Sequence, residues 1–180
     1  MNEFPKRYSK TAITLHWVIA VMVFMSLFLG GRVLAEIDNV NPEKISALQG
    51  HMVFGLLVGV LMLVRIIVRF TSRRPAPRST GNSLLDRLGG LTHALLYLLV
   101  IGMVASGIGI SILTGLPQIV FQGVGELPAS FNGLPPWIAH TVIAKILMAL
   151  IALHIAGALF HHFKLKDDLL SRMGIGRARD

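Results

Sequence analysis

Seven histidines are the residues of this 180-residue chain that are best suited to hold a metal or a metal-bearing cofactor. The chain contains no cysteine, which excludes disulfides, iron–sulfur clusters, thiolate zinc sites and covalently attached c-type haem. His140 and His154 are separated by 14 residues, which in a helix is a rise of about 21 Å and about four turns. Their imidazoles therefore project from nearly the same face of one helix, at two depths.

Other histidines match these two depths. His51 shares the outer depth with His140, and the two form the candidate pair for one haem, because haem iron takes axial imidazoles from facing helices. His16 and His93 share the inner depth with His154, and periodicity does not decide which of them is its partner. The pattern predicts two haems b, one above the other across a membrane.

Three more residues are candidates for roles at these depths. Arg65 lies 14 residues after His51, on the same helix face but at the inner depth, where a haem propionate would pair with a buried guanidinium. His161 follows His154 by seven residues, where contact with a quinone carbonyl and contact with lipid headgroups are equal alternatives. Lys145 is open between three roles: reaching the interface, neutralising an outer propionate, or attracting an anion.

Four apolar stretches must position these side chains. Hydrophobic residues make up 53% of the chain and charged residues 14%, whereas soluble domains carry about 25% charged residues. The stretches cover residues 11–31, 50–70, 91–113 and 137–160, each long enough for the roughly 20 helical residues that cross a bilayer. Asn41-Pro42 and Pro135-Pro136 are helix-start signals. We therefore expect one all-α domain over residues 1–180, an up-down transmembrane four-helix bundle.

The cations sort by membrane side. Twelve Lys and Arg residues lie before the first stretch, between the second and third, or after the fourth, and the other side has only Arg32 and Lys44. The positive-inside rule then places both termini in the cytoplasm. A nucleic-acid partner is not expected, because the basic residues do not form one binding face.

The motifs around the histidines resemble the bacterial cytochrome b561 family over nearly the whole chain. The residues that carry the resemblance are Tyr8-Ser9, Leu15-His16-Trp17, His51, Leu63 to Arg69, Leu91 to Tyr97, Trp137 to His140, Leu153-His154, His161-His162-Phe163 and Lys166 to Met173. The resemblance implies a multi-pass protein of the bacterial inner membrane. It also implies axial ligation of the inner haem by His16 with His154, and of the outer haem by His51 with His140.

The resemblance also implies electron transfer from a donor at the outer face to quinone in the lipid bilayer. We expect the donor to be superoxide and the acceptor ubiquinone, which would make the chain a superoxide:ubiquinone oxidoreductase. A superoxide site requires Arg32, Lys44 and Lys145 to lie near the outer haem, since the outer loops carry more anions than cations. The alternative is an anchor subunit that takes electrons from a periplasmic redox protein, a hydrogenase or a dehydrogenase. A third, haem-free interpretation is a small transporter or a structural bundle, with the histidines as a proton relay.

Overall fold

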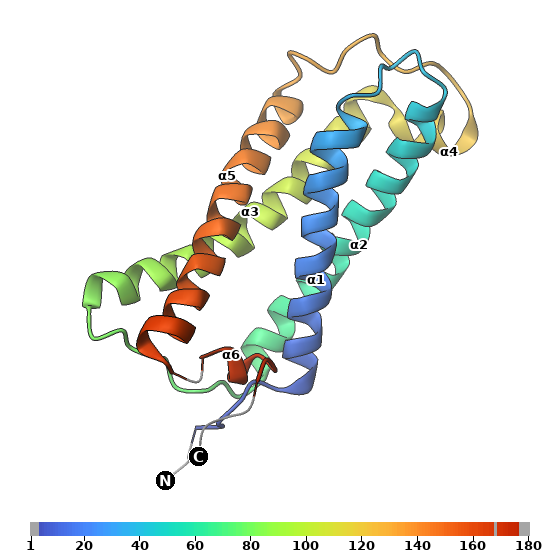
Figure 1. The fold of residues 1–180 in the computed structure, drawn as a ribbon. Helices are drawn as coiled ribbons and strands as arrows, with labels where there is room; N and C mark the ends of the chain where they lie inside the picture. Colours follow the sequence, from blue (N-terminus) through green and yellow to red (C-terminus); the bar gives the residue numbers. More distant parts are fainter. Residues whose placement is uncertain (1–3, 168, 177–180) are drawn as a thin grey trace.

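Figure 1 shows the fold of the chain in a computed structural model, which describes residues 4–167 and 169–176. All regular structure within these residues is helical. The elements are α1 (Lys10–Leu29), η1 (Gly30–Leu34), α2 (Glu43–Thr71), α3 (Ser83–Thr114), α4 (Leu116–Gln122), α5 (Pro135–Phe160), η2 (His161–Leu165) and α6 (Leu169–Arg172). The two η elements are single π-helical turns that continue α1 and α5. The predicted all-α class with four long helices is confirmed.

Polar caps and prolines determine where the long helices begin. Ser9 caps α1 and Asn82 caps α3, since each side chain accepts a backbone N–H of the first turn. α2 follows Asn41-Pro42, where Asn41 Oδ1 accepts the Glu43 N–H at 2.9 Å. α5 has Pro135-Pro136 in its first turn, where proline removes no helical hydrogen bond. Both predicted helix starts are therefore confirmed.

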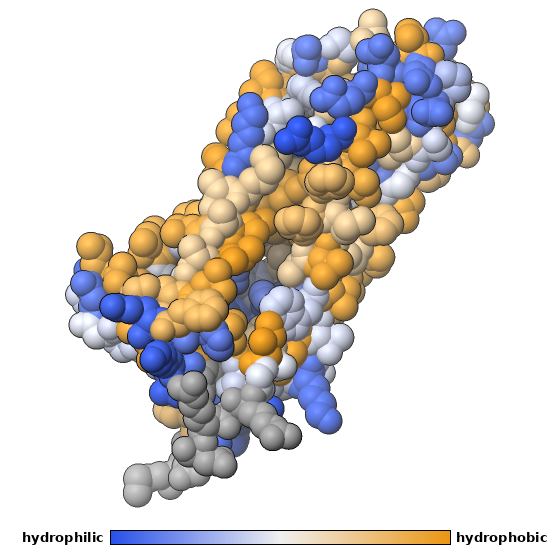
Figure 2. Space-filling model, viewed as in Figure 1, coloured by the Kyte–Doolittle hydropathy of each residue, from blue (hydrophilic) through white to orange (hydrophobic). Residues whose placement is uncertain are grey.

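Four helical segments are long and apolar enough to cross a membrane: residues 10–34, 43–71, 83–114 and 135–165. They are longer than the predicted stretches, because the helices continue past the apolar residues to their caps. Figure 2 shows apolar residues over the middle of the visible face and hydrophilic residues at its two ends. Large apolar side chains of these segments, such as those of Phe24, Leu56 and Leu98, are more than half exposed. Lipid tails are the surroundings that suit such a surface.

The bundle consists of two helix pairs. α1 lies along α2, α3 lies along α5, and contacts between α2 and α3 join the pairs (Figure 1). A Cβ atom on Gly59 would lie 2.9 Å from Val104 Cγ1, so the lack of a side chain at this position lets α2 and α3 pack closely. The buried residues of the middle layer are Ile19, Met22, Val23, Val58, Met62, Val100 and Leu147.

The two ends of the bundle differ. The end that we call outer carries the short helix α4, whose Leu116 and Val120 pack on Leu48 of α2 and Ile110 of α3. The sequence predicted only a loop there. At the other end, which we call inner, the Tyr8 N–H donates to Arg172 O at 3.3 Å. The two ends of the described chain thus lie on one side of the bundle, as an even number of membrane crossings requires (Figure 1).

Candidate functional site

The outer end holds His51 of α2 and His140 of α5 with their ring centroids 6.0 Å apart and the ring planes at 72°. These two histidines were predicted as a pair, and the structure brings them together. Their separation is informative. Two imidazoles that bind one metal atom from opposite sides have centroids about 6 Å apart, from two bonds of about 2 Å and about 1 Å from each nitrogen to its ring centre.

Ser106 of α3 controls the orientation of the His140 ring. Its hydroxyl donates to Met103 O at 2.9 Å, and its oxygen lies 3.0 Å from His140 Nδ1. Because the single hydroxyl proton goes to the carbonyl, Nδ1 of His140 is the donor of the second bond. Nε2 then keeps its lone pair, which is the form of imidazole that binds a metal.

Small residues make room for both outer rings. A Cβ atom on Gly30 would lie 3.2 Å from His51 Cε1, and one on Gly107 would lie 3.5 Å from His140 Cε1. Ser26 lies one turn before Gly30. Among the buried side-chain nitrogen and oxygen atoms of the described residues, its hydroxyl oxygen is the one that has no hydrogen-bond partner. A ligand bound at this depth would give that hydroxyl an acceptor.

The inner end holds a second pair with nearly the same separation. His16 of α1 and His154 of α5 have ring centroids 6.2 Å apart and ring planes at 75°. Figure 2 shows the surface hollowed between the helix pairs in the inner half of the molecule. A third ring, that of His93 on α3, lies 5.0 Å from His154. The three histidines predicted at the inner depth therefore lie together, with the rings of His16 and His93 both next to that of His154.

Arg65 of α2 contacts His16. Its Nη2 donates to His16 Nδ1 at 3.1 Å and its Nη1 donates to Ala12 O at 3.1 Å, while the guanidinium lies 5.7 Å from the centre of the Tyr97 ring. Arginine has no acceptor, so the proton of a neutral His16 ring sits on Nε2 here. For Nε2 of His16 to bind a metal, the ring proton must move to Nδ1, so Arg65 must give up its hydrogen bond to Nδ1 and donate to another acceptor. An anionic group at this depth would provide that acceptor.

His93 has the opposite arrangement. Its Nδ1 donates to Gly89 O at 2.7 Å, which leaves the lone pair on Nε2. The 5.0 Å centroid distance to His154 is about 1 Å shorter than one shared metal atom requires. Distance therefore favours His16 as the partner of His154, whereas the hydrogen bonds as they stand favour His93.

The two histidine pairs are separated by the apolar middle layer. Leu147 lies midway between His140 and His154 on α5 and is 2% exposed. Within the described residues, no group of three or more His, Cys, Asp or Glu side chains is arranged to hold a metal ion. Sites with two histidines suit an iron atom whose other four ligands come from a porphyrin.

One of the three cations that a superoxide site would need, Lys44, is not available at the outer surface. Lys44 is 7% exposed, and its ammonium donates to Leu34 O at 2.7 Å and to Ile37 O at 2.6 Å. The ammonium therefore satisfies carbonyl groups at and just after the end of η1, and it is withdrawn from the surface. Arg32 and Lys145 are exposed.

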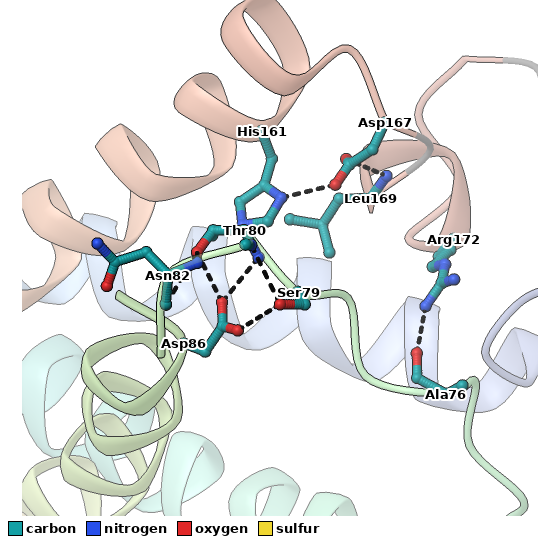
Figure 3. A network of polar contacts seen from close by, with 10 residues as sticks. Ala76, Ser79, Thr80, Asn82, Asp86, His161, Asp167, Leu169 and Arg172 are labelled. Atoms are coloured by element: carbon teal, nitrogen blue, oxygen red, sulfur yellow. Dashed lines mark hydrogen bonds and ion pairs between the residues drawn. The ribbon is translucent and has the colours of Figure 1, made fainter. Parts of the chain in front are cut away.

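His161 lies at the inner end in a network of polar contacts (Figure 3). Its Nδ1 is 2.7 Å from Asp167 Oδ2, and the two side chains are 15% and 17% exposed. Burial opposes ionisation of Asp167, but hydrogen bonds from His161 and the Leu169 N–H, and the charges of His161 and Arg78, together lower its pKa below the ordinary value. The carboxylate is therefore an anion that accepts hydrogen bonds from His161 and the Leu169 N–H.

Sequence reasoning did not single out Ser106, Gly30 or Asp167 for these contacts. Ser106 and Gly30 are common small residues in membrane helices, and only the packing of their helices reveals which histidine each one touches. A signal for Asp167 existed in its place six residues after His161. Reading that signal required knowledge that the chain turns back at Lys166, which has φ 51°.

Comparison with known proteins also points to a cytochrome b. The family model described as "Prokaryotic cytochrome b561" matches residues 7–176. The chain is 33% identical over 171 residues to "Cytochrome b562" of Cereibacter sphaeroides, covering 92% of this chain and 94% of that protein. It is 28% identical over 179 residues to "Cytochrome b561 homolog 2" of Escherichia coli, with 94% and 92% covered.

A Yersinia pestis protein named "Probable superoxide oxidase CybB" is 27% identical over 175 residues, with 93% of this chain and 96% of that protein covered. The family match spans all four transmembrane helices and both histidine pairs. The length of that match establishes what kind of membrane protein this is. The chain belongs to the prokaryotic cytochrome b561 family, multi-pass proteins of the bacterial inner membrane that bind haem b and transfer electrons.

Proposed function

We propose that this chain is a di-haem cytochrome b that accepts electrons at its outer face and delivers them to ubiquinone near its inner end. The observation that carries the proposal is the pair of nearly equal separations, 6.0 Å for His51 with His140 and 6.2 Å for His16 with His154. The lysines and arginines of the inner end support a cytoplasmic position for that end and for both termini, by the positive-inside rule.

In this proposal His51 and His140 hold the outer haem, and His16 and His154 hold the inner one. Haem supplies one-electron redox chemistry when it is bound. Ser106 keeps the lone pair of His140 on Nε2. With haem bound, Arg65 would turn from His16 Nδ1 to a propionate; it would then neutralise a buried anion and leave His16 in the form that binds iron.

The apolar layer between the pairs has its own role. Leu147, Val58 and Val100 are nearly inaccessible to solvent, so they exclude water from the space between the two depths. They also provide no group that could take up a proton on the way. The layer thus keeps electron transfer separate from proton movement across the membrane.

Quinone reduction requires protons as well as electrons. Conversion of ubiquinone to ubiquinol takes two electrons and two protons, and two superoxide ions supply the electrons as they become dioxygen. His161 lies at the inner end, seven residues beyond His154, and its Nδ1 is already paired with Asp167. Its Nε2 is the atom that we assign to a quinone carbonyl oxygen.

Superoxide is our first candidate for the donor. Support comes from the relative named "Probable superoxide oxidase CybB", which is similar along 93% of this chain. The burial of Lys44 leaves Arg32 and Lys145 as the exposed cations that could attract an anion toward the outer pair. Attraction by so few charges predicts a modest salt dependence of the superoxide reaction.

A basic periplasmic redox protein is the second candidate, and the charge of the outer end favours it. Four exposed carboxylates lie there, on Glu36, Asp38, Glu43 and Glu126. With Lys44 withdrawn into hydrogen bonds to carbonyls, the outer surface is acidic. Such a surface would steer a basic protein toward the outer haem more effectively than it would an anion.

Two measurements on the purified protein test these proposals. The pyridine haemochrome assay should give two non-covalent haems per chain, and one haem or none would refute the di-haem proposal. Stopped-flow mixing with superoxide should then reduce both haems faster than superoxide dismutates. If superoxide leaves the haems oxidised while a basic redox protein reduces them, with a rate that falls as salt is added, the second candidate replaces the first.

A further inference from the structure

At the inner end of the bundle, the first residue of η2 forms a histidine–carboxylate pair with the segment that follows η2. Figure 3 shows His161 between Asp167 of the following segment and the loop that contains Thr80. Asp167 Oδ2 lies 2.7 Å from His161 Nδ1, and Asp167 Oδ1 accepts the Leu169 N–H at 3.0 Å. Each carboxylate oxygen therefore has its own partner, which fixes the plane of the carboxylate relative to the imidazole.

The backbone brings the two residues together through a specific turn. η2 ends at Leu165, and Lys166 takes a left-handed conformation with φ 51°. The chain reverses there, and the Asp167 N–H donates back to His161 O at 3.3 Å. A left-handed residue other than glycine costs about 1 kcal/mol, so the surrounding contacts must hold this turn in place.

The charges around His161 come from three segments. Asp167 lies on the segment after η2 and Arg78 on the loop between α2 and α3, where it acts on the Asp167 carboxylate. Asp86 of α3 is the third charged group, and its oxygens are occupied by Ser79 Oγ at 2.6 Å and by the Thr80 N–H and hydroxyl, each at 2.8 Å. Asp86 therefore adds negative potential near His161, whereas Asp167 alone of the three is hydrogen-bonded to the ring.

The pair defines which nitrogen of His161 is available. An ionised carboxylate can only accept, so Nδ1 of His161 carries a proton that points at Asp167. The remaining ring nitrogen, Nε2, faces away from Asp167 and is the atom through which the ring can exchange protons. A carboxylate behind a histidine also stabilises the doubly protonated ring, which is the form able to give a proton away.

We propose that Asp167 is the positioning residue for proton delivery to quinone, acting through His161; this inference rests on the quinone site proposed above. Each ubiquinone that gains two electrons takes up two protons, and Nε2–H of His161 delivers a proton to a carbonyl oxygen. The ring is then reprotonated from cytoplasmic water. Asp167 keeps the ring oriented and places a negative charge beside its Nδ1–H, without itself touching the quinone.

A purely structural role for the pair makes different predictions. In that case the bond from His161 to Asp167 only fastens the C-terminal segment to α5. Its loss would lower thermal stability, and the pH dependence of quinone reduction would not change. Kinetics measured as a function of pH therefore separate a positioning residue from a clamp.

The experiment uses full-length protein in detergent, with haems reduced beforehand and mixed with ubiquinone-1 on both sides of the ordinary histidine pKa of about 6.5. Asp167→Asn should lower the maximal reoxidation rate about tenfold, a fraction of what a general acid contributes. It should also move the pH at half-maximal rate downward, because the protonated ring loses its anionic neighbour. The haem content and the Kd for ubiquinone-1 should stay at their wild-type values.

Asp86→Asn is the matched control, since it removes a nearby carboxylate that is not bonded to the ring. A shift in the pH of half-maximal rate as large as that of Asp167→Asn would overturn the positioning role in favour of general field effects. If Asp167→Asn lowers haem content, Asp167→Glu is used, which keeps the charge. It should retain the wild-type pH of half-maximal rate while lowering the rate, and a full wild-type rate would refute the proposal.

His161→Ala distinguishes failure of this inference from failure of the quinone site. If His161→Ala slows reoxidation and Asp167→Asn does not, the quinone site stands and the role of Asp167 is wrong. If His161→Ala itself reacts at the wild-type rate, quinone is reduced elsewhere and both proposals fail. His162→Ala, at an exposed neighbouring position, should leave the rate unchanged.

Discussion

The rings of His16 and His154 lie 6.2 Å apart, within 0.2 Å of the separation of His51 and His140 at the other end of the bundle. Two sites with nearly one geometry, built from three different helices, support our proposal that both hold the same kind of ligand. The inner site differs in having a third ring, that of His93, closer to His154 than His16 is.

The first prediction identifies the inner ligand. We expect His16→Ala to lose about half of the haem, because of the two rings beside His154 only that of His16 lies at the separation that one shared iron would require. His93→Ala should retain both haems and their low-spin spectra. The haem-to-protein ratio and the optical spectrum measure both outcomes, and loss of haem only in the His93 variant would reverse the assignment.

The second prediction concerns the outer pair. His51→Ala and His140→Ala should each lose about half of the haem, with the same haem missing in both, since either side chain alone leaves one axial position empty. Redox titration of the remaining haem should give the same midpoint in the two variants. Acid–acetone extraction of the wild-type protein should remove all haem, because the chain has no cysteine for covalent attachment. Retention of both haems in His140→Ala would contradict the pairing.

The sequence was sufficient for the four helices and the two depths of histidines. The positions of the helices follow from the apolar stretches and from the helix-start signals Asn41-Pro42 and Pro135-Pro136. These signals act between residues that are close in sequence, so the sequence alone reveals them. The 14-residue spacing likewise fixes how His140 and His154 stand on α5. Rotation of one helix relative to another depends on packing between them, and this is why the choice between His16 and His93 could not be made.

The same reasoning explains what the sequence did not reveal at the ends. Lys44 was counted among the outer cations that a superoxide site would need near the haem, but its position in the first turn of α2 places its ammonium against the carbonyls of Leu34 and Ile37. α4 has only seven residues, too few for a periodic signal. The π turn at His161–Leu165 and the reversal at Lys166 depend on contacts with Asp167, which no helical periodicity encodes.

The third prediction tests Arg65. Arg65→Leu should lower the midpoint potential of the inner haem and leave the outer one unchanged, because removing a nearby cation favours the oxidised, more positive iron. In Arg65→Lys, the midpoint potential of the inner haem should lie between those of Arg65→Leu and the wild type, since lysine keeps the charge but cannot form a bidentate pair with a carboxylate. Potentiometric titration resolves the two haems. An inner midpoint that is unchanged in Arg65→Leu would rule out pairing of Arg65 with a propionate.

The fourth prediction uses two adjacent glycines in η1. A Cβ atom on Gly30 would lie 3.2 Å from His51 Cε1, whereas a Cβ atom on Gly31 would have nothing within 4 Å. Gly30→Ala should therefore press on the His51 ring, at a cost of about 1–3 kcal/mol, and reduce the occupancy of the outer haem. Gly31→Ala makes the same change in helix propensity without that contact, so it should keep two haems. Equal haem content in the two variants would show that the Gly30 backbone does not position His51.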